Sequence, residues 1–128
     1  MTPLLLAQLL PSQPAIIEQF RPRDADSGRI VIDGVEYKYR LKDVDAPEPD
    51  YRAKCRAERL LAGDAFRYQR QLTEGSRMRV ERTYGLDKYG RNLVDLSVDG
   101  QDLAYVMERR GYLKVWDYDG GSGKPDWC

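Results

Sequence analysis

Apolar and polar residues alternate along the N-terminal half of the chain in a way that predicts short β-strands. Residues 15–20 predict a first strand, and residues 21–27 predict a polar loop that carries Asp24 and Asp26. Two β-rich runs at residues 29–32 and 35–44 flank Asp33-Gly34, a pair typical of the type I′ turn of a two-residue hairpin. In the returning strand apolar and charged residues alternate, so we expect Arg40 on the polar face of a half-buried strand.

The prolines within residues 46–50 enforce a loop, and a segment with helical spacing of its apolar residues follows. Between residues 52 and 72 the apolar positions recur at helical spacing, and they are Ala57, Leu60, Leu61, Ala65, Tyr68 and Leu72. Gly75 is well placed to end this helix.

The C-terminal half predicts two more strands and a second helix. Strands are expected at residues 76–84 and 91–98, with a loop at 85–90 between them and an Asp99-Gly100 turn after them. Asp102 is the expected N-cap of a helix that runs to Arg110 and ends at Gly111, and residues 112–118 are expected to be extended. This order predicts a β-rich α+β fold, a five-stranded OB-fold barrel with two packed helices. Such barrels bind nucleic acids or oligosaccharides or serve as plain protein modules, so the fold alone does not decide the function.

The length of 128 residues suits one domain with one core. We divide the chain into an apolar N-terminal arm (residues 1–14), the folded domain (15–119) and a C-terminal tail (120–128). The arm is too short to span a bilayer and lacks the cationic start of a signal peptide, so we expect a soluble protein and no membrane partner. An apolar arm needs a surface to pack on, which makes the stretch from Met1 to Leu10 a candidate for self-association or for binding another protein.

The charge balance limits how the chain could bind a polyanion. Lys+Arg and Asp+Glu both number 21, which gives a formal net charge of zero. Non-specific affinity for nucleic acid comes mainly from cations that displace phosphate counterions. Any nucleic-acid site must therefore be a local positive cluster offset by acids elsewhere, with weak and salt-sensitive binding.

The absence of histidine removes several kinds of chemistry. It excludes histidine acid–base catalysis, the Ser-His-Asp and Cys-His arrangements and most zinc sites. Cys55 and Cys128 are too few for a four-thiolate site, and they could form one disulfide or remain free thiols. We favour free thiols, because nothing else in the sequence marks an oxidising compartment.

Three polar clusters are the candidates for chemistry. They are Asp24-Ala25-Asp26-Ser27, Arg40 together with Asp45-Ala46-Pro47-Glu48, and Asp87-Lys88-Tyr89-Gly90-Arg91. Each alone is commonly a turn or a solvated face. Together they contain the residue types that metal-assisted cleavage of phosphodiesters needs: carboxylates for calcium or magnesium, guanidinium groups for phosphate, and a glutamate for the attacking water.

From about residue 16 to residue 115 the chain resembles the thermonuclease (staphylococcal nuclease-like) family. The family's Asp-Gly-Asp-Thr loop is similar to residues 24–27, and its Arg-x-x-x-x-Asp-x-Pro-Glu run is similar to residues 40–48. Its Asp-Lys-Tyr-Gly-Arg signature stands unchanged at residues 87–91. The intervals of fourteen residues from Asp26 to Arg40 and eight from Arg40 to Glu48 also fit the family.

The resemblance implies a role for each of these residues. Arg40 and Arg91 would grip the scissile phosphate, and Glu48 would act on the attacking water as general base or as its positioner. The implied calcium ligands are Asp26, Asp45, the backbone carbonyl of Ala46 and, through a water, Glu48, and the implied substrate contacts are Lys88, Tyr89 and Tyr118. The implied reaction is calcium-dependent hydrolysis of DNA or RNA with little sequence preference, leaving 3′-phosphate ends.

The chain also departs from the family pattern. Ala25 and Ser27 replace a glycine and a threonine, and the tail replaces a cationic C-terminal helix whose space Trp127 is a candidate to fill. Two hypotheses stay open: an active nuclease, and an OB module that serves as a structural or protein-binding part of a larger assembly such as a phage or mobile-element particle. The compartment stays open between a secreted protein and such a particle.

Overall fold

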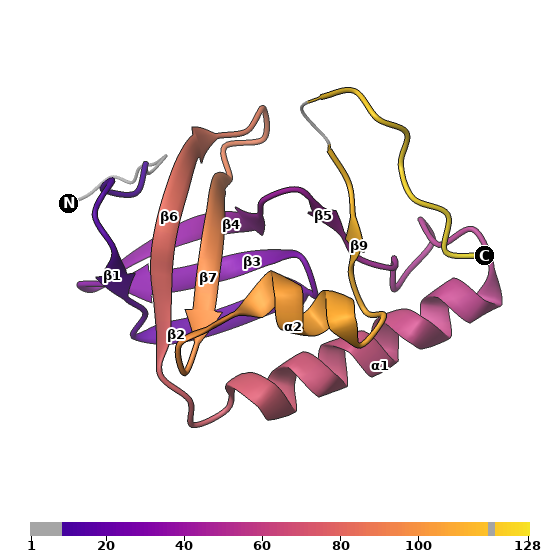
Figure 1. Cartoon of the computed structure of the whole chain (residues 1–128), viewed down its shortest axis with the longest axis horizontal. Helices are drawn as coiled ribbons and strands as arrows, with labels where there is room; N and C mark the ends of the chain where they lie inside the picture. The colour runs from indigo at the N-terminus through magenta and orange to yellow at the C-terminus, as the bar shows by residue number, and fades with distance from the viewer. Residues whose placement is uncertain (1–8, 118–119) are drawn as a thin grey trace.

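The computed structural model describes residues 9–117 and 120–128, which form a β-rich α+β fold (Figure 1). A mixed seven-stranded sheet has the order β1-β6-β7-β4-β3-β2, with β8 paired to β7. Its strands are β1 (Ala15–Ile16), β2 (Gln19–Asp24), β3 (Ser27–Ile32), β4 (Val35–Leu41), β6 (Met78–Leu86), β7 (Asn92–Val98) and β8 (Gln101–Asp102). A small second sheet pairs β5 (Val44–Asp45) with β9 (Lys114–Val115), and the helices are α1 (Arg56–Thr73) and α2 (Leu103–Arg109).

The predicted hairpin turns are confirmed. Asp33 and Gly34 have φ angles of 49° and 78°, and Asp99 and Gly100 have 48° and 84°. Positive φ at both central residues is the requirement of a type I′ turn, and Asp-Gly meets it at low cost. These turns set the antiparallel pairing of β3 with β4 and place β8 and α2 directly after β7.

The polar loop predicted at residues 21–27 is wrong, because β2 continues to Asp24 and β3 begins at Ser27. Arg21 and Arg23 are exposed and alternate with half-buried Phe20 and Pro22, so the polar sequence concealed a strand. A register shift between Pro22 and Asp24 bends the strand towards the turn. Gly28 is needed opposite this shift, since a Cβ there would lie 2.5 Å from the carbonyl oxygen of Arg21.

The predicted five-stranded OB-fold barrel is not confirmed, because the sheet of the described residues is mixed, has seven strands and does not close. No ladder joins β1 to β2 in the described part of the chain, and the parallel pair β4–β7 sits in the middle of the sheet. The strand predicted at residues 15–20 is divided between the two edges instead. The N–H of Ile17 donates to Met78 O (2.9 Å) and the N–H of Glu18 donates to Val31 O (2.8 Å), so one continuous segment serves both edges.

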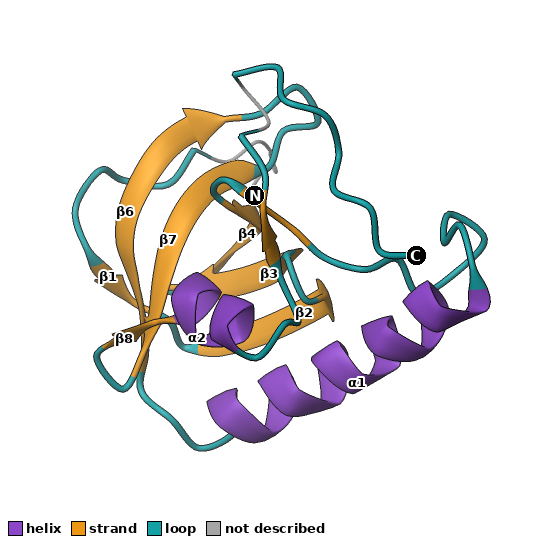
Figure 2. Ribbon diagram, turned by 45° about the vertical axis from the view of Figure 1, so that its right-hand side comes forward, coloured by secondary structure: helices purple, strands orange, loops and turns teal. Residues whose placement is uncertain are grey.

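The core lies between the concave side of the sheet and the helices. Figure 2 shows the curled sheet with α2 against its lower end and α1 passing below. Fully buried apolar side chains fill this space, among them Ile30, Tyr39, Leu41, Val94, Leu96, Leu103 and Met107. Gln69 of α1 is also fully buried, and its Nε2 donates to Ala25 O at 2.9 Å, which ties the helix to the β2–β3 turn.

Both predicted helices are present. α1 begins at Arg56 rather than near residue 52, because Cys55 is its N-cap and its Sγ accepts from Glu58 N at 3.4 Å. Asp102 caps α2 as predicted, accepting from Tyr105 N at 2.9 Å. Neither of these helices combines the length and the apolar character that a bilayer crossing requires.

The prediction that both cysteines are free thiols is wrong, since Cys55 and Cys128 form a disulfide with a Cα–Cα distance of 6.1 Å. The last residues fold back along the molecule, so the chain end reaches the beginning of α1 (Figure 1). This return of the tail over 73 residues of sequence is a tertiary contact that the spacing of the cysteines did not reveal. The disulfide fixes the tail beside the candidate site.

Candidate active site

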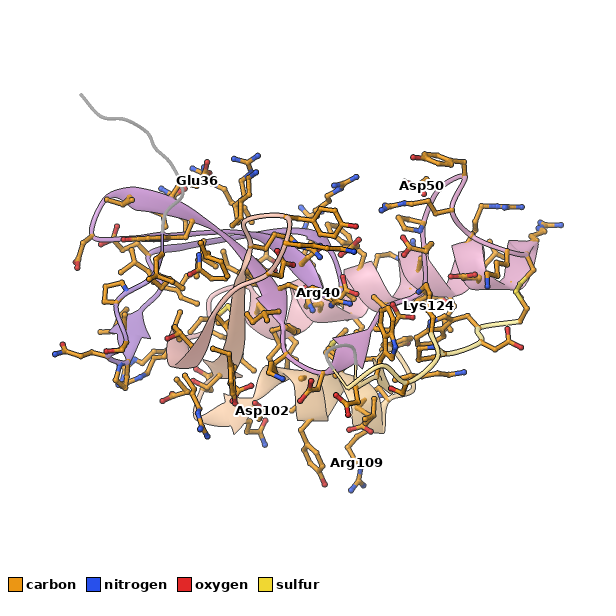
Figure 3. All side chains as sticks on the ribbon, turned by 90° about the horizontal axis from the view of Figure 1, so that it is seen from above. Glu36, Arg40, Asp50, Asp102, Arg109 and Lys124 are labelled. Atoms are coloured by element: carbon orange, nitrogen blue, oxygen red, sulfur yellow. A yellow bond between two sulfur atoms is a disulfide. The ribbon has the colours of Figure 1, made fainter. Side chains whose placement is uncertain are left out.

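One open pocket of about 820 Å³ brings together the three polar clusters of the sequence. Asp26, Arg40, Asp45, Glu48 and Arg91 all line it. They come from the β2–β3 turn, the end of β4, β5, the loop after β5 and the residue before β7. Side chains that are up to 65 residues apart therefore converge on one wall of the sheet. Figure 3 labels two of the pocket's cations, Arg40 and Lys124.

Arg40 is held firmly beside Asp26. Pairing of Ser27 with Arg40 in the β3–β4 ladder sets the two residues next to each other, and Arg40 Nη1 lies 3.1 Å from Val44 O and 3.4 Å from Asp26 Oδ2. Its guanidinium carbon is 5.8 Å from the ring centroid of Trp116. Arg40 is only 6% exposed, so the expectation of a half-buried strand with an open polar face needs correction. The end of β4 is buried on both faces, one by the core and the other by the pocket wall.

Asp26 is a buried carboxylate in an acidic surrounding. Its Oδ2 accepts from the Ala46 N–H at 3.0 Å as well as from Arg40. Burial raises its pKa well above the ordinary value, the charge of Asp24 and a hydrogen bond with it raise it further, and Arg40 opposes the rise. An additional cation near this carboxylate would favour its ionised form.

Asp45 is bound by the C-terminal tail, which the sequence reasoning missed. Lys124 Nζ lies 2.8 Å from both carboxylate oxygens of Asp45, and Trp127 Nε1 donates to Oδ2 at 2.8 Å. The same ammonium group is 3.9 Å from Glu48 Oε2. The sequence did contain a signal for this contact, because the Gly/Ser/Pro-rich tail holds a lysine, a tryptophan and a cysteine close together. A disulfide from this cysteine to Cys55 brings all three residues to the pocket.

One carboxylate oxygen of Glu48 is buried, and no hydrogen bond to it is found among the described residues. The N–H of Glu48 donates to Glu58 Oε2 at 2.8 Å, which fixes the backbone of the loop to the start of α1. Oε1 lies 3.3 Å from Arg52 Nη2, yet across the described ranges 9–117 and 120–128 this buried oxygen accepts no hydrogen bond. Burial raises the pKa of Glu48, while Arg52 and Lys124 limit the rise. A poised carboxylate with an unsatisfied oxygen in a pocket fits a base or a metal ligand.

Asp87 orients Arg91 within the Asp-Lys-Tyr-Gly-Arg stretch of residues 87–91. Its Oδ1 accepts from the N–H groups of Tyr89 and Arg91 at 2.8 and 2.9 Å, and its Oδ2 accepts from Arg91 Nε at 2.8 Å. Burial alone would raise the pKa of Asp87, but these hydrogen bonds lower it overall. Arg91 Cζ also lies 5.2 Å from the ring centroid of Tyr89, so the guanidinium is fixed from two sides.

The residues predicted to contact substrate differ in their position relative to the pocket. Tyr89 lines the pocket and is 61% exposed, which leaves its ring accessible. Lys88 is exposed outside the pocket lining, with Nζ 5.3 Å from the Tyr89 ring centroid. Ala46 is buried and uses its N–H on Asp26, and Tyr118 lies outside the described residues.

The pocket is cationic although the chain as a whole is neutral. Four acids line it, Asp24, Asp26, Asp45 and Glu48, against eight cations, which are Arg21, Arg23, Arg29, Lys38, Arg40, Arg52, Arg91 and Lys124. Much of this charge is compensated nearby, since Glu36 pairs with Arg21 at 2.7 Å and with Arg29 at 3.2 Å. Asp87 pairs with Arg91 at 2.8 Å, and Asp50 pairs with Arg52 at 3.1 Å. The lining is nevertheless the local positive cluster that a polyanion requires.

The donor types in the pocket fit a hard divalent cation, but they are not assembled around one. Asp26, Asp45 and Glu48 supply carboxylate oxygens, and Glu48 Oε1 is an unsatisfied buried acceptor. Within the described residues no group of three or more acidic, histidine or cysteine side chains is arranged to hold a metal. Lys124 provides the positive charge at Asp45 instead.

Comparison with known proteins adds nothing to these observations. No protein-family model matches the chain, and no curated protein matches it either.

Proposed function

We propose that this chain is a calcium-dependent nuclease of the thermonuclease type, which hydrolyses DNA or RNA with little sequence preference. The observation that carries the proposal is the common pocket of Arg40, Arg91 and Glu48 with the carboxylates of Asp26 and Asp45. Eight cationic side chains in the lining support a polyanionic substrate. The proposal includes the fold, read as an OB-type barrel left open where one segment passes from edge to edge.

Two fixed guanidinium groups suit a phosphodiester. Arg40 is buried and tied to Asp26 and Val44, and Arg91 is oriented by Asp87, so neither has to be ordered when substrate binds. Arginines that are already in place stabilise the charge that grows on phosphate oxygens in the transition state without a reorganisation cost. We assign both residues to binding the scissile phosphate.

Glu48 is assigned to the attacking water. Its Oε1 accepts no hydrogen bond within the described part of the chain, and its raised pKa moves Glu48 toward the range in which a carboxylate is an effective base. Asp26, Asp45, the Ala46 carbonyl and, through a water, Glu48 would hold calcium, which supplies Lewis-acid stabilisation of the phosphate charge when bound. Tyr89 and Lys88 would bind the nucleotide beside the phosphate, and the reaction leaves a 3′-phosphate.

The test is cleavage of denatured DNA by the full chain at micromolar concentration. We expect degradation with calcium, none with chelator, and a loss of about 10²- to 10⁴-fold in rate for Glu48→Gln and for Arg91→Ala. Glu74→Gln is the matched control, because Glu74 is an exposed glutamate at the end of α1, outside the pocket. Intact DNA in the presence of calcium, or equal rates for Glu48→Gln and wild type, would rule out this assignment.

A second candidate is a protein-binding module, and the tail over Asp45 is what favours it. A side chain that already carries an ammonium and an indole partner is closed to a ligand unless the tail moves. Light scattering of the intact chain against a chain that lacks residues 1–13 tests this candidate. Identical monomeric masses would show that residues 1–13 do not mediate assembly and would count against this candidate, and a mass that falls on truncation would support it.

A further inference from the structure

We infer that Lys124 is the resident cation of the carboxylate site, and that the C-terminal tail, residues 120–128, competes there with a divalent metal. This inference rests on the calcium site of the proposed function and adds a component to it. It concerns three tail residues, Lys124, Trp127 and Cys128, to which the sequence motifs gave no role at the carboxylates.

The contacts of Lys124 are those of a bound cation. Its Nζ lies 2.8 Å from each of the two Asp45 carboxylate oxygens and 3.9 Å from Glu48 Oε2. Asp45 is almost fully enclosed, with a side chain only 3% exposed, and the remaining donor is the Trp127 indole at 2.8 Å. All the direct neutralisation of Asp45 among the described residues therefore comes from the tail, 79 residues away in sequence.

The tail is anchored at both of its ends. At its beginning, Trp116 Nε1 donates to Ser122 O at 2.9 Å, and the Ser122 N–H and hydroxyl both contact Asp117 O. At its end, the disulfide joins Cys128 to Cys55 at the N-cap of α1. A group tethered by a few residues has an effective concentration in about the millimolar range at its site, so Lys124 returns quickly after each release.

A divalent cation and Lys124 cannot use the Asp45 oxygens at the same time. Calcium needs direct carboxylate oxygens, and an ammonium at hydrogen-bond distance from both of them occupies that position. The apparent calcium affinity is then the intrinsic affinity multiplied by the fraction of molecules in which Lys124 is released. Two charge-assisted hydrogen bonds keep this fraction small, and we expect removal of the ammonium to tighten calcium binding about 10- to 100-fold.

The experiment is direct calcium binding by isothermal titration calorimetry, which needs no turnover. Lys124→Met should bind calcium about 10- to 100-fold more tightly than wild type, and Lys124→Arg, which keeps the cation, should stay close to wild type. Cys128→Ser, which releases the end of the tail, should shift affinity in the same direction by a smaller factor. Lys54→Met is the control for loss of one positive charge, since Lys54 is exposed and outside the pocket.

Each result decides the inference. Equal or weaker calcium binding by Lys124→Met, with thermal unfolding like that of wild type, would overturn it, as would an equal gain in Lys54→Met. Calcium binding by none of the variants would overturn the inference together with the calcium site. Tighter binding by Lys124→Met without cleavage of DNA by any variant would support the tail inference and reject the nuclease.

Discussion

The disulfide between Cys55 and Cys128 should account for a large part of the stability of this domain. The two residues are separated by 73 positions. In the chain-entropy account, a crosslink that closes a loop of this length destabilises the unfolded chain by about 4 kcal/mol at 25 °C. The double replacement Cys55→Ser, Cys128→Ser removes the crosslink and keeps a side chain that can cap α1. Because serine is a good N-cap, about 0.5–1 kcal/mol of this loss should be recovered, leaving a net loss of about 3 kcal/mol.

Urea unfolding followed by circular dichroism measures this loss. The denaturation midpoint of the double variant should fall, and its slope m should rise, because the unfolded chain without a crosslink exposes more surface. The melting temperature should fall by about 10 °C for a domain of this size.

Wild-type protein treated with a dithiol reductant is the matched control. The reagent is oxidised to its own disulfide while Cys55 and Cys128 become thiols, so this sample carries the same loss of crosslink without a substitution. It should lose about 0.5–1 kcal/mol more than the double variant, because it lacks the serine cap. A loss below about 1 kcal/mol in both samples would refute the reasoning, because the loop-closure term would then be absent or cancelled.

Two further predictions concern the walls of the site. Asp87→Asn should lower the free energy of unfolding at neutral pH by about 1–3 kcal/mol, since it weakens the hydrogen bonds from Arg91 and Tyr89. The pKa of Asp87 is below its ordinary 3.8, because these bonds outweigh the opposite effect of burial. The stability advantage of wild type over Asp87→Asn should therefore be complete above pH 3.8 and shrink as the pH falls further. A constant difference in urea titrations from pH 7 to 2 would contradict this. Gly28→Ala should cost about 1–3 kcal/mol or prevent folding, because its Cβ would lie 2.5 Å from Arg21 O and 2.7 Å from Pro22 Cα, both of them backbone. In the control Gly63→Ala, on α1, the new Cβ would meet only the Arg67 side chain at 3.4 Å, so this variant should be neutral or stabilising. Thermal unfolding measures both variants, and equal losses at the two glycines would be inconsistent with a steric cause.

Local signals predicted the local structure of this chain well. Asp33-Gly34 and Asp99-Gly100 set their turns because few residue pairs tolerate positive φ twice in succession. Asp102 predicted the start of α2 through its side-chain bond to Tyr105 N. Such features depend on neighbours in sequence, so the sequence contains most of the information about them.

The misses depend on contacts between distant residues. The strand through residues 21–24 was concealed by its outward charges, and the division of residues 15–24 between two sheet edges depends on β3 and β6. The burial of Arg40 follows from the pocket wall on its side of β4. The motifs indicated which residues share a pocket, whereas the approach of Lys124 and Trp127 to Asp45 depends on the fold of a tail with no periodic pattern.

The segment through Ile17 and Glu18 has a consequence for solubility during handling and storage. Its N–H groups donate to Met78 O on β6 and to Val31 O on β3, the strands next to the two edges of the sheet. A proteolytic nick between β1 and β2 would release the short β1 first, since only two residues pair there. The uncovered margin of β6 would then be a template for strands of other copies, and we expect nicked preparations to aggregate at concentrations where intact protein stays dispersed.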